Sequence, residues 1–139
     1  MFYLTRIENG RMNVPEPVFY EAKAGEEIVI GEALVLASGK LTKCGATVKP
    51  AFIAMGEVSA AAEKRNVAVC RVAANQLWEV PVSAAPTSLV AGSKVTLHTD
   101  GLQVTATTSG GTITIVDTLG AAAAGDKVLV RIEAGAAGE

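Results

Sequence analysis

The sequence predicts a mainly β fold: a compact β-barrel or β-sandwich with an extended N-terminal arm and at most one or two short helices. Two observations carry this prediction. Short runs rich in Val, Ile and Thr recur along the chain, and Gly, Asn, Asp and Ser separate them every 8–15 residues. The alternation of strands with helical segments that is typical of a parallel sheet is missing. A length of 139 residues fits one domain that needs no disulfide or metal to fold.

The first part of the chain predicts an arm. Residues 2–8 have the pattern of a short strand or extended segment, and the turn dipeptide Asn9-Gly10 ends it. Pro15 and Pro17 each remove an amide donor and favour an extended residue before them, so no helix is expected there. We therefore divide the chain into an extended N-terminal arm at 1–23, a β domain at 24–133 and a flexible tail at 134–139.

Short alternating runs define the strands after residue 17. They cover residues 18–22, 28–30, 33–37, 41–44, 52–58, 67–72, 77–82, 95–98, 102–107, 112–116 and 128–133. A turn at Asn75-Gln76 predicts that the runs 67–72 and 77–82 form a hairpin. Residues 60–65 and 119–124 are the two candidates for short helical turns, and both are too short to be stable alone.

One turn motif occurs three times. The pattern Ala-Gly-x-x-(Ile/Val) is found at 24–28, 91–95 and 124–128. We expect a positive φ at each glycine and the start of a strand at each β-branched residue. The uneven spacing of the three copies argues against a solenoid, so the motif is interpreted as a repeated turn.

Composition limits the partners. The formal net charge is −2 and basic residues form no run, which argues against nucleic acid. The longest alanine stretches are far too short to span a membrane, and the N-terminus lacks the pattern of a secretory signal. Charged residues make up only 19% and hydrophobic residues 50%. We expect other subunits to cover apolar surface; the alternative is a core rich in Ala and Val.

The sequence contains no motif that indicates catalysis or metal binding. His98 is the only histidine, and no nucleophile motif accompanies it. Cys44 and Cys70 lack neighbouring ligands, so we expect them to be reduced and buried. Lys40, beside the Ser38-Gly39 turn, is the nearest candidate for a carrier lysine, but its flanks do not match such a motif. The prediction is therefore no enzyme, no catalytic or metal site and no cofactor.

Four of the six aromatic residues lie within the first twenty positions. Large aromatic side chains dominate interface energetics, so we hypothesise that residues 1–20 dock on a neighbouring subunit. The alternative, left open, is that these side chains fold back on the chain's own barrel. The candidate interface residues are Phe2, Tyr3, Arg6, Arg11, Asn13, Pro15, Phe19 and Tyr20.

Several segments in order resemble the small capsid decoration (cement) proteins of tailed bacteriophages. They are Arg11–Glu16, Ala24–Ile28, Ala54–Val58, Val67–Val72 with Leu77–Pro81, and Ala124–Val128. The resemblance implies a structural protein made in the bacterial host cytoplasm and located on the outer surface of the virion head. It also implies a homotrimer that bridges neighbouring major capsid subunits and stabilises the expanded capsid. The alternatives are a tail or fibre component and, less favoured, a carrier-type β-barrel.

Overall fold

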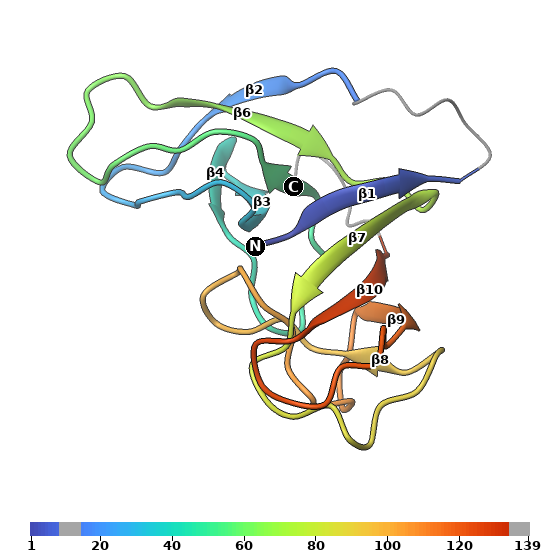
Figure 1. Cartoon of the computed structure of the whole chain (residues 1–139). Helices are drawn as coiled ribbons and strands as arrows, with labels where there is room; N and C mark the ends of the chain where they lie inside the picture. The colour runs from blue at the N-terminus through green and yellow to red at the C-terminus, as the bar shows by residue number, and fades with distance from the viewer. Residues whose placement is uncertain (9–14, 134–139) are drawn as a thin grey trace.

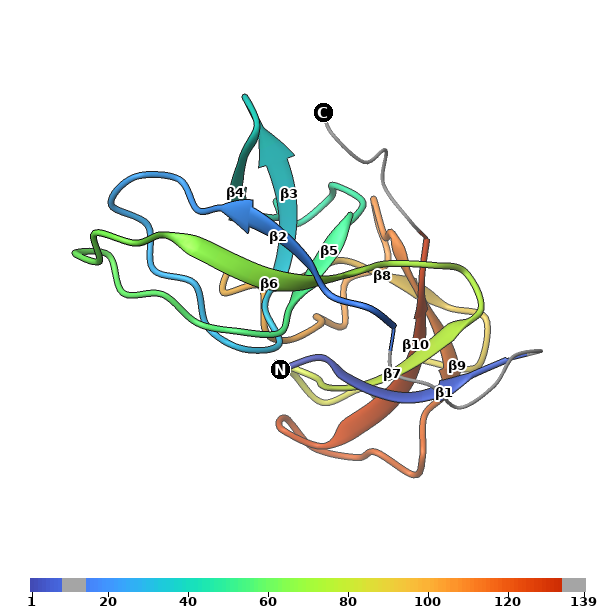
Figure 2. The same cartoon turned by 90° about the horizontal axis from the view of Figure 1, so that it is seen from above.

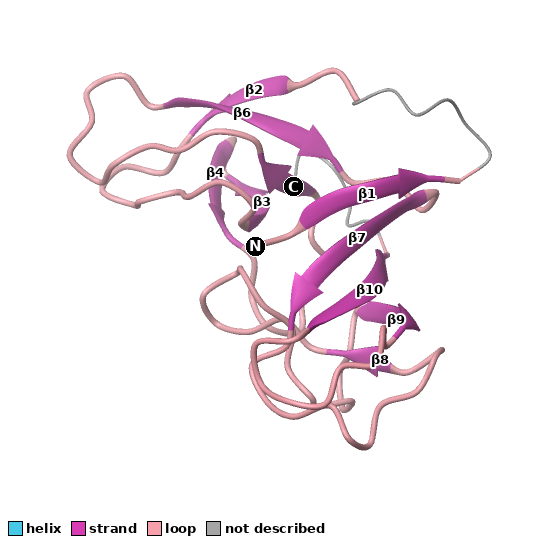
Figure 3. Cartoon of the chain, in the orientation of Figure 1, coloured by secondary structure: helices cyan, strands magenta, loops and turns pink. Residues whose placement is uncertain are grey.

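The computed structural model describes residues 1–8 and 15–133. These residues form ten strands and no helix, arranged as two five-stranded antiparallel sheets (Figures 1 and 3). Neither sheet closes into a barrel, so the arrangement is sandwich-like. The prediction of a mainly β fold is confirmed, and of the two architectures considered the sandwich is the one observed. No helix in the described residues is long and apolar enough to cross a membrane.

Sheet I is formed by the start of the chain and its second half. Its strands, in spatial order, are β1 (Tyr3–Ile7), β7 (Gln76–Pro81), β10 (Lys127–Ile132), β9 (Ile113–Asp117) and β8 (Lys94–Val95). Strand β10 alternates between buried and more exposed positions, with Val128, Val130 and Ile132 fully buried. This period of two is what a strand with one face on a core requires.

Sheet II is formed by the intervening residues. Its strands, in spatial order, are β2 (Val18–Glu21), β6 (Asn66–Arg71), β5 (Phe52–Ala54), β3 (Ala33–Ala37) and β4 (Lys40–Lys43). An isolated parallel bridge between Ala22 and Leu41 joins the ends of β2 and β4, so the sheet curls strongly. Seen from above, β2 and β6 lie side by side and apart from the strands of sheet I (Figure 2).

The curl of sheet II produces two hydrophobic clusters. The larger cluster lies between the sheets and includes Phe2, Trp78 and Ile113 from sheet I with Ile53 and Cys70 from sheet II. The smaller cluster lies on the other face of sheet II, where the curl buries large side chains such as Leu34, Leu41 and Phe52. Both faces of β5 are therefore buried, which explains its uninterrupted apolar sequence.

The positive φ expected at each glycine of the repeated turn motif is confirmed, but a strand follows only the second and third copies, because Ile28 makes just an isolated bridge to Val58. Gly25, Gly92 and Gly125 have φ values of 77°, 93° and 90°. A Cβ at any of the three would meet no atom within 4 Å, so glycine is needed for its backbone conformation and not for space. The β-branched residue that ends each copy, Ile28, Val95 or Val128, is fully buried.

The predicted hairpin of residues 67–72 and 77–82 is wrong. Strand β6 pairs with β2 and β5 in sheet II, whereas β7 pairs with β1 and β10 in sheet I. The buried Gln76 side chain fixes the connection, because it accepts from the Ala73 amide (2.9 Å) and donates to the Arg71 carbonyl (3.1 Å). The turn therefore carries the chain from one sheet to the other (Figure 1).

Two further predictions need correction. Residues 60–65 form turns and bends instead of a helix, and the Arg65 guanidinium donates to the carbonyls of Ser59 (2.8 Å) and Lys23 (2.7 Å). Residues 102–107 do not form a strand: Val104 alone pairs there, through isolated bridges to Val82 and Leu97. Side-chain hydrogen bonds and long-range contacts determine the conformation of both segments. Neither kind of contact leaves a pattern in the local sequence.

Candidate interaction surface

The N-terminal segment supplies one edge strand to each sheet. Strand β1 lies at the edge of sheet I and pairs with β7, and β2 lies at the edge of sheet II and pairs with β6 (Figure 1). The Phe2 amide donates to the Gly31 carbonyl at 2.9 Å, which ties the start of β1 to the other sheet. The described residues of the predicted arm are thus integrated into the sandwich.

An apolar groove lies where these two edges approach each other. Its volume is about 250 Å³, and its floor includes Ile53, Cys70 and Trp78. Residues from four separate segments line its rim: Met1, Tyr3, Pro15, Ile30 and Met55. No charged side chain of the described residues lines it. The groove therefore suits an uncharged apolar occupant, because burying an unpaired charge would cost several kcal/mol.

Exposed apolar side chains concentrate around this groove. Met1, Tyr3, Ile30 and Met55 are all exposed. Phe19, which is 65% exposed, extends the same surface, because it pairs with Ala68 and the Met55 amide donates to the Ala68 carbonyl. Residues that pair across a sheet share a face. A contiguous exposed apolar surface of this kind marks an interaction site more often than a random surface feature.

The candidate interface residues predicted from the sequence do not all lie at the groove. Phe2 is only 2% exposed and belongs to the core between the sheets, whereas Tyr3, its neighbour, is 57% exposed at the groove rim. Pro15 lines the groove, and Arg6 is exposed on β1. Arg11 and Asn13 lie outside the described residues.

Tyr20 lies away from the groove. It alternates with Phe19 along β2, and its ring centroid is 5.2 Å from that of Phe52 in the smaller cluster. The Arg71 guanidinium donates to the Tyr20 hydroxyl at 3.4 Å. Tyr20 therefore packs on its own chain, and the two aromatics of β2 serve opposite faces of sheet II.

Sequence reasoning missed Met1, Ile30 and Met55. The predicted interface rests on the aromatic side chains of the first twenty residues and on their polar and proline neighbours, whereas these three are aliphatic or thioether residues from separate segments. The strand expected at residues 28–30 is wrong, because Ile28 makes only an isolated bridge and Ile30 lies in an exposed turn. Only the long-range pairing of the sheets brings them together, so no local signal was available.

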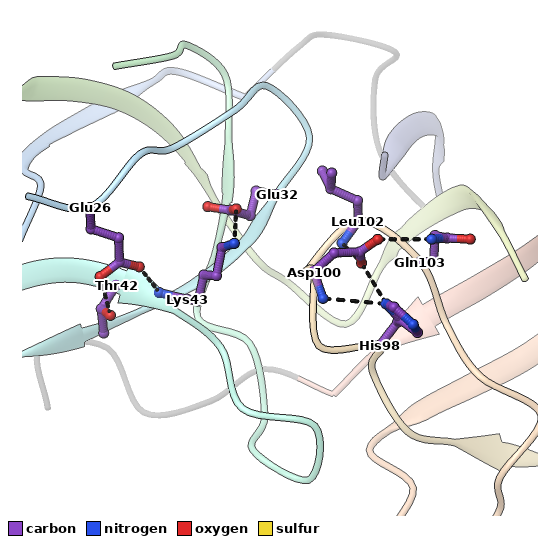
Figure 4. A network of polar contacts seen from close by, with 8 residues as sticks. All are labelled: Glu26, Glu32, Thr42, Lys43, His98, Asp100, Leu102 and Gln103. Carbon is purple, nitrogen blue, oxygen red and sulfur yellow. Dashed lines mark hydrogen bonds and ion pairs between the residues drawn. The ribbon is translucent and has the colours of Figure 1, made fainter. Parts of the chain in front are cut away.

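Two separate groups of polar contacts are seen in Figure 4, one around Glu32 and Lys43 and the other in the loop of His98 and Asp100. Glu32 is 1% exposed, and its Oε1 lies 3.8 Å from Lys43 Nζ. Its Oε2 has no hydrogen-bond partner among the described residues. Burial raises the pKa of Glu32 to about 7, and Lys43 offsets part of this effect. At Gly101, a Cβ would lie 2.9 Å from Glu32 Cγ, so the glycine leaves room for the buried carboxyl.

The only histidine takes part in a loop network. Asp100 accepts from the Leu102 amide and from Gln103 Nε2, both at 2.8 Å, and its Oδ1 lies 3.2 Å from His98 Nδ1. Burial alone would raise the pKa of Asp100, but these hydrogen bonds outweigh it and lower the pKa. The network has the form of a turn-stabilising cluster. In the described residues no group of three or more His, Cys, Asp or Glu side chains is placed to hold a metal.

Both cysteines are buried, as expected. Burial raises the pKa of the Cys44 thiol to about 12 and also raises that of Cys70. A thiol with a raised pKa is a poor nucleophile at neutral pH because little thiolate is present. Both side chains pack in the larger hydrophobic cluster.

The fold is similar to that of a phage protein. The crystal structure of the N base of head fiber gp8.5 in bacteriophage phi29 matches with a TM-score of 0.57 and 19% sequence identity. The match covers 84% of this chain and 94% of that chain. No protein-family model matches the sequence, and no curated protein matches it either. The likeness at this identity is one of fold.

Proposed function

We propose that the chain is a structural protein of a phage virion that binds the outside of an icosahedral head and bridges neighbouring major capsid subunits. The similarity of fold to the base of a phage head fiber, over most of both chains, is the observation that carries the proposal. The apolar groove and the exposed Phe19 give such a protein a surface for attachment.

Stabilisation follows from linkage. A protein that binds the expanded shell and not its precursor shifts the equilibrium toward the expanded state. At a free concentration of about 100 times Kd, each site contributes roughly 2.7 kcal/mol. Many copies on one shell make these contributions cumulative, so a groove of modest size is sufficient. A homotrimer that engages three subunits at once would add avidity.

Co-sedimentation tests the proposal. The purified chain is mixed with expanded heads and, separately, with precursor heads of the phage that encodes it. We expect pelleting with expanded heads only, and loss of pelleting for Met55→Lys, which places a charge at the groove rim. Val90→Lys is the matched control, because Val90 is 65% exposed outside the groove. A chain that stays in the supernatant with expanded heads contradicts the proposal.

The second candidate is the base of a head fibre, and the fold similarity to the phi29 protein favours it specifically. Both candidates place the chain on a head. They differ in what electron microscopy of decorated heads would show. A bridging protein gives density that spans several capsid subunits, whereas a fibre base gives density that carries an outward projection.

A further inference from the structure

The free edge of β1 faces the groove. In sheet I only β7 lies beside β1, and among the described residues no strand pairs with the other side of β1. Leu4 and Tyr3 of this strand line the groove. The edge of a sheet offers backbone groups for pairing with another chain. The question is which backbone groups of β1 point into the groove.

The hydrogen-bond pattern of β7 answers this question. The Val82 amide, just after β7, donates to the Asp126 carbonyl at 3.0 Å, so Val82 faces β10. Backbone groups alternate sides along a strand, and Trp78, four residues earlier, therefore also faces β10. Leu4 is opposite Trp78 in the β1–β7 register. It consequently receives no backbone bond from β7, and its N–H and C=O point outward.

The start of β1 agrees with this direction. Phe2 lies two residues before Leu4, and its amide donates to Gly31 on the side away from β7. Among the described residues no hydrogen bond ends on the outward side of Leu4. One backbone donor and one backbone acceptor thus border an otherwise apolar groove.

These two groups restrict the conformation of the occupant. A buried backbone donor or acceptor without a partner costs about 1–3 kcal/mol, so an occupant that covers Leu4 must bond to it. A helix has no free main-chain groups along its side. An extended segment has a free backbone N–H and a free C=O along its edge, and it also places alternate side chains into the groove.

A second copy of β1 is a poor occupant. The inward side chains along this edge are Phe2, just before β1, and Leu4 of β1; Phe2 belongs to the core between the sheets and Leu4 packs against that core. They have little apolar surface left to fill the groove of another copy. The occupant must bring its own uncharged apolar side chain.

We propose that an extended, uncharged apolar segment of about five residues from a major capsid subunit adds a strand to the free edge of β1 and inserts a side chain into the groove. The length follows from the five residues of β1. This inference rests on the proposed function, because it names the partner of the same surface.

Hydrogen exchange of the Leu4 amide tests the pairing. The full chain is exposed to D₂O free and bound to expanded heads, and residue-resolved mass spectrometry compares Leu4 with Tyr3. Tyr3 faces β7 and is the internal control. We expect exchange at Leu4 to slow by about tenfold or more on binding, because a new hydrogen bond must open before exchange occurs.

The outcomes are distinct. A chain that binds heads with an unprotected Leu4 refutes strand addition and leaves the proposed function standing. A chain that does not bind heads refutes both. Leu4 protection in the free chain also overturns the proposal: if protection rises with concentration the occupant is a second copy, and if it is independent of concentration the occupant belongs to the same chain.

Discussion

Replacing Glu32 with Gln should remove a pH dependence of stability. The carboxyl is buried at the junction of the sheets with one oxygen unpartnered among the described residues. Burial is the main cause that raises its pKa from the usual 4.5 to about 7. The charges that face it are Lys43, which lowers the pKa, and Glu26 and Asp100, which raise it.

The direction of the effect follows from proton counting. Between pH 4.5 and about 7 the folded chain holds a proton on Glu32 that the unfolded chain has released. Stability therefore falls as pH rises through this window, and Glu32 causes no further change of stability with pH above or below it. The difference between the two pKa values corresponds to about 3 kcal/mol, at roughly 1.4 kcal/mol per unit. This is a large part of the 5–15 kcal/mol typical of a domain.

Urea unfolding followed by Trp78 fluorescence at pH 5, 6, 7 and 8 measures the effect. The wild-type free energy of unfolding should fall by about 2–3 kcal/mol over this range relative to that of Glu32→Gln. Subtracting the two curves removes the contribution of the groups that both proteins share. The matched control is Glu27→Gln, an exposed neighbour, which should follow the wild type. Parallel curves for the wild type and Glu32→Gln would refute a carboxyl that is neutral in the fold.

Three other predictions, one of them with a control substitution, concern the free energy of unfolding, and urea denaturation measures each of them. Leu119 has a φ of 52° and is exposed, so Leu119→Asn should stabilise by roughly 0.5–1 kcal/mol because Asn tolerates this conformation better. Gly111→Ala should destabilise by about 2 kcal/mol or more, since its Cβ would lie 2.5 Å from the Lys94 carbonyl group, whereas Gly56→Ala, with contacts no closer than 3.9 Å, should be near neutral. Arg65→Met should cost about 2–3 kcal/mol, because it leaves the carbonyls of two loops without their charged donor.

Local chemistry explains what the sequence predicted correctly. The three glycine turns and the hairpin strand Ala33–Ala37 depend on residues within five positions of each other. Glycine at positive φ and a β-branched residue at the start of a strand are preferences of the residues themselves. Such features need no knowledge of the partner strand.

The features that the sequence did not predict depend on which strands pair with each other. Strands β6 and β7 are close in sequence and have hairpin-like patterns, yet each finds its neighbours in a different sheet. The buried Gln76 side chain bonds to the backbone of the connection between them, and glutamine is not a typical turn residue. The groove depends on the same long-range pairing, so Ile30 and Met55 carry no pattern that marks them as rim residues. Glu32 was missed because a carboxylate is almost never fully buried.

The division of the N-terminal aromatics changes how the interface should be tested. The extended backbone places Phe2 in the core and Tyr3, the first residue of β1, at the groove rim, so two adjacent residues serve stability and contact. Deleting residues 1–14 would remove β1 as well as any docking surface. Loss of the Phe2 side chain alone should cost about 3–5 kcal/mol, which is enough to unfold a marginal domain. A truncated chain that fails to bind would therefore not distinguish an interface from a fold defect. Substitutions at exposed rim positions such as Met55 leave the core intact, and only these can separate attachment to a partner from the stability of the chain itself.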